Sequence, residues 1–337
     1  MSQLTLVIPV FNEGAPLTDN VRAIREAVAR IPEHRFQFLL VDDGSTDDSF
    51  IHLSAIRDTY ADVSVLRLTR NFGKEAAIQA GLEHVDEASD AVIVMDADMQ
   101  HPPALIPGMV ALWNSGIDVV EAEKIRRQSE SAISRWMAEV FYRIFFLLTG
   151  MDIRNQSDFK LLDRRVLDFY RNLHERERFF RGMIHWGGFP LARLTFEVSP
   201  RRHGNSRWSR FKLWRYSISA ITSFSSAPLH FITILGALTF VVSIIFSAKA
   251  LYDKFSGVAL GGFTTVILLQ LFIGSTLMIS LGLLGIYVAR IHDEVKRRPS
   301  YIVDWRVNSQ KSASDENKRA QQDEVDDRHQ QDLEQKG

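Results

Sequence analysis

Residues 91–103, AVIVMDADMQHPP, carry the strongest indication of the fold and the chemistry of this chain. The apolar run 91–95 predicts a buried strand of a parallel sheet. Asp96 and Asp98 follow it, and two carboxylates one residue apart at a strand's end leave the sheet on the same side. With the amide oxygen of Gln100, they predict a Mg²⁺ or Mn²⁺ site at the edge where open α/β sheets bind ligands. The alternative is a polar turn with two solvated carboxylates.

Strands and helices alternate on the N-terminal side of this stretch. Strands are predicted at residues 4–10, 36–41 and 63–68, and helices at 16–31 and 75–84. Such alternation predicts a doubly wound sheet with right-handed crossovers, in which the polar ends of successive strands meet at one edge. The residues that we expect to converge there are Asn12, Glu13, Asp42, Asp43, Arg70, Lys74, Asp96 and Asp98.

Further local patterns mark the loops and the second half of this region. The turn DDGSTD at 42–47 is rich in side-chain acceptors and predicts a helix cap at 45–47. Later strands are predicted at 118–122 and 191–198. Between them, residues 134–148 have the charged and apolar stripes of an amphipathic helix, which either packs on the sheet or lies in a membrane interface.

Two long apolar stretches near the C-terminus predict membrane spans. No charged residue lies between Arg215 and Lys249 or between Lys254 and Arg290, and both intervals exceed the roughly 20 residues that cross a bilayer. We place the spans at about 230–250 and 264–289; two buried helices of a soluble core are the alternative. The preceding segment 201–215 has six Lys and Arg residues, no acidic residue and interleaved aromatic residues, which predicts a helix on an anionic membrane surface rather than a nucleic-acid site.

Composition and charge placement set the expected organisation. The 337 residues include no cysteine, which excludes a disulfide framework or thiolate site, and the N-terminus has no signal pattern. Basic residues flank both spans outside the short connecting loop, so we expect the catalytic domain and both termini in the cytoplasm. The predicted parts are a catalytic domain, interfacial helices, two spans, a juxtamembrane segment and a disordered polar tail, at 1–200, 201–227, 228–290, 291–307 and 308–337.

Several motifs, taken together in this order, resemble one known family. They are IPVFNE (8–13), VDDGSTD (41–47), RNFGKEAAIQAGL (70–82), DADMQHPP (96–103), SDFKLLDR (157–164) and RRHGNSRW (201–208), followed by the two spans. The chain resembles the membrane-bound family 2 glycosyltransferases that act on polyprenyl phosphates, such as bactoprenol glucosyltransferases and dolichol-phosphate mannose synthases. The resemblance covers about residues 3–305.

The resemblance implies a GT-A (Rossmann-like) glycosyltransferase domain followed by two transmembrane helices. It also implies an inverting enzyme of the bacterial inner membrane, a nucleotide-sugar donor, a divalent metal and a homo-oligomer. UDP-glucose and undecaprenyl phosphate are the expected substrates, with GDP-mannose, UDP-N-acetylhexosamine or UDP-aminoarabinose as other donors. A non-catalytic membrane scaffold is an alternative. A dehydrogenase is disfavoured, because no G-x-G-x-x-G follows the first strand.

The resemblance also assigns residues, and we add Asp43 and Lys74 from their place at the sheet edge. Donor-nucleotide binding is expected from Pro9, Phe11, Asn12, Glu13, Asp42, Asp43 and Lys74. The metal would be held by Asp96, Asp98 and Gln100. The acceptor phosphate would contact Lys124, Arg127, Arg135, Arg202, Ser206 and Arg207. Arg207 and Lys124 replace the family's usual Lys and Arg, which keeps the charge but changes the hydrogen-bonding geometry.

The expected mechanism needs no strong general base, since a lipid phosphate is already anionic near pH 7. The requirements are to align the two reactants and to stabilise the departing diphosphate. Asp96 and Asp98 act there through the metal. Asp158 is a third catalytic candidate that would orient the sugar or the acceptor; alternatively it forms a salt bridge with Lys160 or Arg164.

Overall fold

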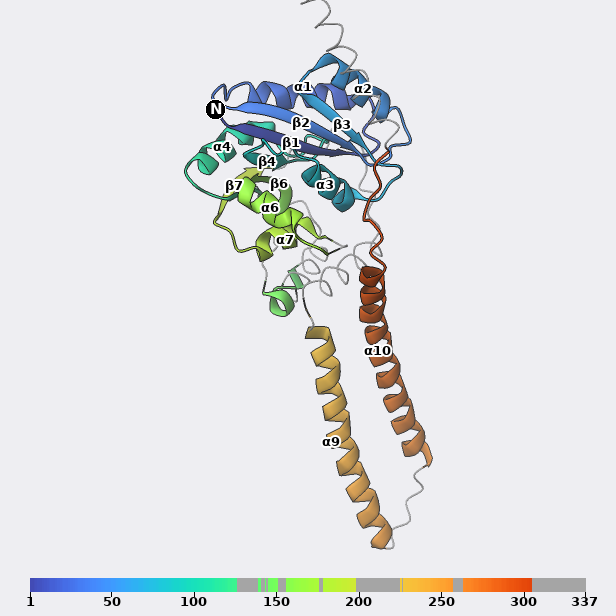
Figure 1. Ribbon diagram of the computed structural model, residues 1–337. Helices are drawn as coiled ribbons and strands as arrows, with labels where there is room; N and C mark the ends of the chain where they lie inside the picture. The colour runs from blue at the N-terminus through green and yellow to red at the C-terminus, as the bar shows by residue number, and fades with distance from the viewer. Residues whose placement is uncertain are drawn as a thin grey trace, which may run out of the picture.

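The computed structural model describes residues 1–125, 139–140, 143, 145–150, 156–175, 178–197, 225, 227–256 and 263–304. Within these residues, one mixed sheet of seven strands carries helices on both faces, and two long helices project away from it (Figure 1). The order of strands across the sheet is β3-β2-β1-β4-β6-β5-β7.

The elements of the sheet and its helices have the following bounds. The strands are β1 (Gln3–Val10), β2 (Arg35–Asp42), β3 (Val63–Arg67), β4 (Ala91–Val94), β5 (Val119–Ile125), β6 (Gln156–Asp163) and β7 (Leu191–Glu197). The helices are α1 (Pro16–Val28), α2 (Ser49–Thr59), α3 (Lys74–Glu83), the short 3-10 helix η1 (Pro103–Leu105), α4 (Ile106–Asn114), α6 (Arg164–Arg171) and α7 (Phe180–Trp186).

The predicted parallel core of the sheet is confirmed. β1 pairs in parallel with both β2 and β4, and β2 pairs in parallel with β3, so the carboxyl ends of these four strands lie at one edge. All four residues of β4 are fully buried. One hydrophobic core lies under α1, α2 and α4, and the other lies under α3, α6 and α7. The sheet is therefore covered on both faces, as a doubly wound architecture requires.

One buried strand was not predicted from the sequence. β6 is antiparallel to β4 and β5, yet its residues include the buried Asp158 and Lys160. The ammonium of Lys160 pairs with the carboxylate of Glu121 on β5, and Arg193 Nε on β7 lies 2.8 Å from the other Glu121 oxygen. These pairings from neighbouring strands allow charged residues in a buried strand, since a buried charge needs a partner.

The predicted helix cap at 45–47 is confirmed at its last residue, because Asp47 Oδ1 accepts the backbone N–H of Ser49 at 3.0 Å. α2 begins at Ser49, and the residue at its N-cap, Asp48, makes no capping hydrogen bond through its side chain. The side chains of Ser45 and Ser49 instead accept hydrogen bonds from the backbone N–H groups of Asn12 and Glu13, at 3.1 and 2.9 Å. The turn after β2 therefore holds the turn after β1 through Ser45 and also caps its own helix through Asp47.

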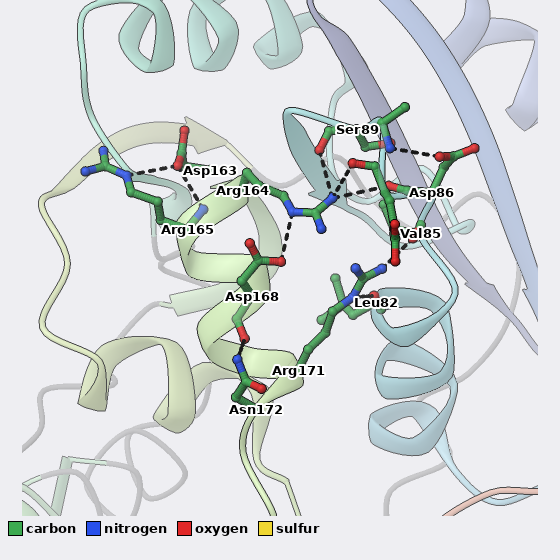
Figure 2. A network of polar contacts seen from close by, with 12 residues as sticks. Leu82, Val85, Asp86, Ser89, Asp163, Arg164, Arg165, Asp168, Arg171 and Asn172 are labelled. Carbon is green, nitrogen blue, oxygen red and sulfur yellow. Dashed lines mark hydrogen bonds and ion pairs between the residues drawn. The ribbon is translucent and has the colours of Figure 1, made fainter.

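A polar network fastens α6 to the edge of the sheet opposite to the ends of β1–β4 (Figure 2). The carboxylate of Asp163 caps α6 by accepting the backbone N–H of Arg165 at 3.0 Å. Arg164 donates to the backbone oxygen of Glu87 at 2.7 Å, and Arg171 Nε donates to the backbone oxygen of Leu82 at 2.9 Å. These bonds join α6 to the end of α3 and to the loop before β4.

Two apolar helices follow the sheet domain in sequence, as predicted. α9 (Ala227–Phe255) and α10 (Phe263–Val295) contain segments of 21 and 27 residues that are long and apolar enough to cross a membrane, with mean hydropathies of 2.4 and 2.0. The second helix extends six residues beyond the predicted end of its span. The Tyr287 hydroxyl donates to the backbone oxygen of Ser225 at 2.8 Å, which connects α10 to the chain just before α9.

The chain returns from α10 to the sheet and pairs with its β3 edge (Figure 1). We call residues 301–304 the return segment. Its Val303 forms an antiparallel bridge with Leu68, and the backbone N–H of Thr69 donates to the oxygen of Ile302 at 2.9 Å. The Tyr301 hydroxyl donates to Glu83 Oε2 on α3 at 2.5 Å. The predicted juxtamembrane segment 291–307 thus includes residues that join the sheet.

Replacing Tyr301 with phenylalanine is expected to loosen the return segment. A hydrogen bond to a charged group contributes about 1.5–3 kcal/mol, so local opening becomes roughly tenfold or more frequent. Hydrogen exchange of peptides covering residues 301–304 and 67–71 measures this opening. Tyr252→Phe, at a ring that is 72% exposed on α9, is the control and leaves the exchange unchanged. Equal exchange in wild type and Tyr301→Phe would contradict the role of this hydrogen bond.

Candidate active site

The loops after β1 and β2 form one interlocked structure at the carboxyl edge. Asn12, in the left-handed region at φ 53°, accepts the backbone N–H of Thr46 at 2.9 Å through its side-chain oxygen. Pro9 is a residue of β1, Phe11 is 37% exposed and Glu13 is partly buried. Four of the seven residues that we predict to bind the donor therefore lie together on or just after β1.

The two aspartates at the end of β2 are both buried. Asp42 Oδ1 accepts the backbone N–H of Ser45 at 3.0 Å, and its Oδ2 lies 3.2 Å from Arg67 Nε. Asp43 accepts the backbone N–H groups of Phe72 and Gly73 at 2.7 and 2.9 Å. Burial raises the pKa of Asp43 to about 6 against the opposing effect of these two N–H groups. The pair holds the neighbouring loops, and its contact with a nucleotide stays a prediction.

Asp43 thereby fixes the start of α3 and its first residue, Lys74. The ammonium of Lys74 lies 2.6 Å from Asp96 Oδ1 after β4 and 2.5 Å from Asp158 Oδ2 on β6. Burial lowers the pKa of Lys74, but the carboxylates of Asp96 and Asp158 outweigh it and raise the pKa above its usual value. Lys74 therefore joins two predicted catalytic carboxylates as a protonated cation.

Asp158 is held from its other side by Arg181 of α7. Arg181 Nε lies 2.6 Å from Asp158 Oδ1, and Nη2 lies 3.0 Å from Oδ2, in a two-pronged contact. Asp158 is only 4% exposed, and burial raises its pKa. Lys74 and Arg181 more than offset burial and hold the pKa of Asp158 well below its usual range. Asp158 is therefore an anion whose oxygens are occupied by cations.

The salt-bridge partners suggested for Asp158 from the sequence are wrong. Lys160 pairs with Glu121, and Arg164 Nε lies 2.8 Å from Asp168 on the next turn of α6. Side chains on the same face of a strand alternate with those on the other face, so the sequence suggested a partner two residues along β6. The actual partners come from two helices, Arg181 of α7 and Lys74 of α3, and the sequence does not show that α7 packs beside β6. Arg181 was missed for this reason, although the run RFFRG at 178–182 shows charged residues among apolar ones.

The predicted metal ligands lie on the turn after β4. Asp96 is partly exposed, with 22% of its side chain accessible, and the ring nitrogen Nδ1 of His101 lies 3.6 Å from its second oxygen. Asp98 Oδ1 accepts the backbone N–H of Gln100 at 3.0 Å. Among the described residues, no group of three or more His, Cys, Asp or Glu side chains is assembled as a metal site. Oxygen ligands of this kind fit a hard divalent cation that takes its remaining ligands from a bound diphosphate.

Most of the residues predicted to bind the acceptor phosphate lie outside the part of the chain that the structure describes. Lys124 is a residue of β5, opposite Phe196 of β7 in the strand register. Arg127, Arg135, Arg202, Ser206 and Arg207 lie outside the described residues. In the predicted helix 134–148, the described residues 139–140, 143 and 145–148 are helical.

Glu75 is a further titratable residue that the sequence did not indicate. Its Oε2 accepts the backbone N–H of Phe180 at 2.9 Å. Burial, with the nearby carboxylate of Asp158, raises the pKa of Glu75 to about 7. Glu75 lies next to Lys74 in sequence and contacts the first residue of α7, so it joins the two helices that hold Asp158.

The titration of Glu75 predicts a pH-dependent stability. Folded protein binds this proton with a pKa near 7 and unfolded protein near 4.5, so this residue's contribution to stability falls as pH rises between these values. The fall amounts to about 2–3 kcal/mol. Denaturant unfolding in detergent from pH 5 to 8 is expected to show a smaller pH slope for Glu75→Gln than for wild type. Parallel curves for the two proteins would contradict the raised pKa.

Comparison with known proteins identifies relatives over most of the chain. The model of the family described as Glycosyl transferase family 2 matches residues 5–170. An uncharacterised glycosyltransferase of Synechocystis is 34% identical over 303 residues, which cover 89% of this chain and 94% of the relative. The bactoprenol glucosyl transferase of Shigella phage SfII is 34% identical over 305 residues, 89% of this chain and 97% of its own. A solved structure of glucosyl-3-phosphoglycerate synthase from Mycobacterium tuberculosis covers 66% of this chain and 80% of its own, at 18% identity and a TM-score of 0.47.

Proposed function

Since the chain belongs to glycosyl transferase family 2 and is a glycosyltransferase, we propose that it transfers a sugar from a nucleotide-sugar donor to a polyprenyl phosphate. The observation that carries this proposal is that an acidic sheet edge and two span-length apolar helices belong to one chain. Relatives named for bactoprenol glucosyl transfer match over the helices as well as the domain, which supports a lipid acceptor. UDP-glucose and undecaprenyl phosphate are the proposed substrates.

The proposed reaction forms a bond between an acceptor phosphate oxygen and the anomeric carbon of the sugar. A phosphate monoester carries close to two negative charges at neutral pH, so it attacks without losing a proton to the protein. The bond from the anomeric carbon to the nucleoside diphosphate breaks, and attack from the opposite side inverts the configuration. The chain's task is to align the two anions and to offset their charges.

In this proposal, some residues act on the departing diphosphate and others on the acceptor phosphate. Lys74 offers a positive charge to the departing diphosphate, and Asp158 with Arg181 keeps Lys74 in place. The low pKa of Asp158 makes it a weak base, which fits a role in orientation. Asp96, Asp98 and Gln100 would hold Mg²⁺ or Mn²⁺, which supplies charge neutralisation for the diphosphate when bound. The acceptor phosphate would be held by the basic residues predicted from the sequence.

Charge placement supports a cytoplasmic site in a bacterial inner membrane. The end of α10 and the chain after it carry Arg290, Lys296, Arg297 and Arg298, whereas the C-terminal end of α9 carries Lys249, Asp253 and Lys254 and the segment 256–262 that joins the two helices has no charged residue. The excess of basic residues on one side predicts that the domain and both termini lie in the cytoplasm. Nucleotide sugars and the phosphate end of the lipid would then meet on that side.

The test is transfer of radiolabelled sugar to undecaprenyl phosphate by the purified full chain in detergent. UDP-glucose, GDP-mannose, UDP-N-acetylglucosamine and UDP-aminoarabinose are compared, each with Mn²⁺ or Mg²⁺ and then with chelator. We expect label in the lipid fraction from UDP-glucose, lost with chelator and absent when undecaprenol without phosphate replaces the acceptor. Nucleotide binding without transfer from any donor would overturn the proposed reaction.

A further inference from the structure

The ammonium of Lys74 forms an ion pair with Asp96, one of the carboxylates predicted to bind the metal. Its nitrogen lies at 2.6 Å from Asp96 Oδ1, which is direct hydrogen-bond contact. The same nitrogen contacts Asp158 at 2.5 Å, and 44% of the lysine side chain is accessible to solvent. Asp96 is thus already paired with a cation of the chain itself at one of its two carboxylate oxygens.

The two carboxylates around Lys74 differ in how firmly they are held. Asp158 is 4% exposed and fastened by the two-pronged contact with Arg181. Asp96 lies on the turn after β4 and is more accessible. Lysine has a flexible four-carbon stem, so its ammonium can turn away from Asp96 while the backbone of α3 stays in place. Asp158 therefore acts as the fixed partner and Asp96 as the exchangeable one.

We propose that Lys74 guards Asp96 against metal alone and releases it when a nucleoside diphosphate arrives, so that metal and nucleotide bind cooperatively. This inference rests on the proposed function. Metal without nucleotide must displace an ammonium that gains no new anion in exchange. A diphosphate supplies that anion, because its oxygens accept the lysine charge while Asp96 turns to the metal. By linkage, each ligand then strengthens the binding of the other by the same factor.

The test measures Mn²⁺ binding to the detergent-purified full chain by electron paramagnetic resonance, with and without UDP. Wild type is expected to bind Mn²⁺ at least tenfold more tightly with UDP than without it. Lys74→Met is expected to bind Mn²⁺ alone about tenfold more tightly than wild type does. In Lys74→Met, the increase in Mn²⁺ affinity that UDP causes is expected to be smaller than in wild type by a similar factor. The reason is that the release of Asp96 by Lys74 no longer contributes to the coupling between the two ligands.

Two further variants make the comparison specific. Arg70→Met removes a cation from the same loop, where the guanidinium lies over the Phe72 ring at 4.3 Å from its centroid. It controls for a general loss of positive charge, and its affinity for Mn²⁺ alone stays within about twofold of wild type. Lys74→Gln keeps a donor for Asp158 without the charge, and it decides the matter if Lys74→Met fails to fold.

The outcomes separate this inference from the proposed function. If the uncharged Lys74 variants bind Mn²⁺ alone no better than wild type, while UDP still promotes binding, the guarding role is overturned and the metal-dependent reaction stands. An equal increase in Arg70→Met would likewise overturn it, because the effect would then be one of general charge. If no variant binds Mn²⁺ even with UDP, both the inference and the proposed metal fail.

Discussion

Asp98→Ala is expected to lower the rate of sugar transfer by about 10³-fold while the protein stays folded. A bound divalent cation contributes several kcal/mol to stabilising a departing diphosphate, and about 4 kcal/mol corresponds to this factor. In the fold, Asp98 accepts one backbone hydrogen bond, from Gln100, and no cation of the described residues forms an ion pair with it. Its removal therefore costs the structure about 1 kcal/mol at most.

Initial rates with labelled donor and undecaprenyl phosphate measure this effect, with thermal unfolding recorded on the same preparations. The matched control is Asp19→Ala, which removes a carboxylate from the exposed surface of α1, where it lies 3.3 Å from Arg22. That variant should retain the wild-type rate. Near-normal turnover in Asp98→Ala would remove Asp98 from the metal site.

Asp158→Asn is expected to damage both stability and turnover. Removing one partner of a buried ion pair typically costs about 3–5 kcal/mol, because the remaining charge stays buried without compensation. Here Arg181 and Lys74 would both face a neutral amide. The melting temperature should fall by about 10 °C, and transfer measured well below it should fall at least about 10²-fold as Lys74 loses its fixed position.

The control for this variant is Asp168→Asn, which also removes a carboxylate from an ion pair. Asp168 lies 2.8 Å from Arg164, but 47% of its side chain is exposed. Exposed pairs contribute at most about 1 kcal/mol, so the melting temperature should change by a few degrees at most. If Asp158→Asn and Asp168→Asn behave alike, the cluster around Asp158 has no special role.

The sequence could predict the first half of the sheet because its signals are local. Buried runs such as 91–94 end in polar turns, and alternation with helices determines that β1, β2, β3 and β4 run in parallel. β6 gave no such signal, because the charges of Asp158 and Lys160 interrupt its apolar pattern. Their partners Arg181 and Glu121 lie on other elements, so only the folded structure shows that these charges are compatible with burial.

In the candidate site too, the residues that follow parallel strands could be predicted from the sequence, and those placed by helix packing could not. Asp96 and Lys74 could be placed at one edge because both follow strands of the parallel set. Arg181 and Glu75 could not, since their roles depend on how α7 packs beside α3 and β6. The return segment was also missed: its pairing with β3 joins Val303 to Leu68, residues far apart in the chain.

The return segment connects the domain to the apolar helices a second time, in addition to the chain that follows β7. The chain leaves the sheet after β7 and rejoins it beside β3, and these are the two opposite edge strands. With strands spaced about 4.8 Å apart, the two attachments lie roughly 30 Å from each other. A domain joined to its membrane helices by a single linker could swivel, whereas the pairing of Val303 with Leu68 ties the chain after α10 to the β3 side of the sheet and limits this rotation. In the proposed function, the site would keep a constant distance from the lipid head groups, and diffusion of the acceptor would be confined to a plane that the site already faces.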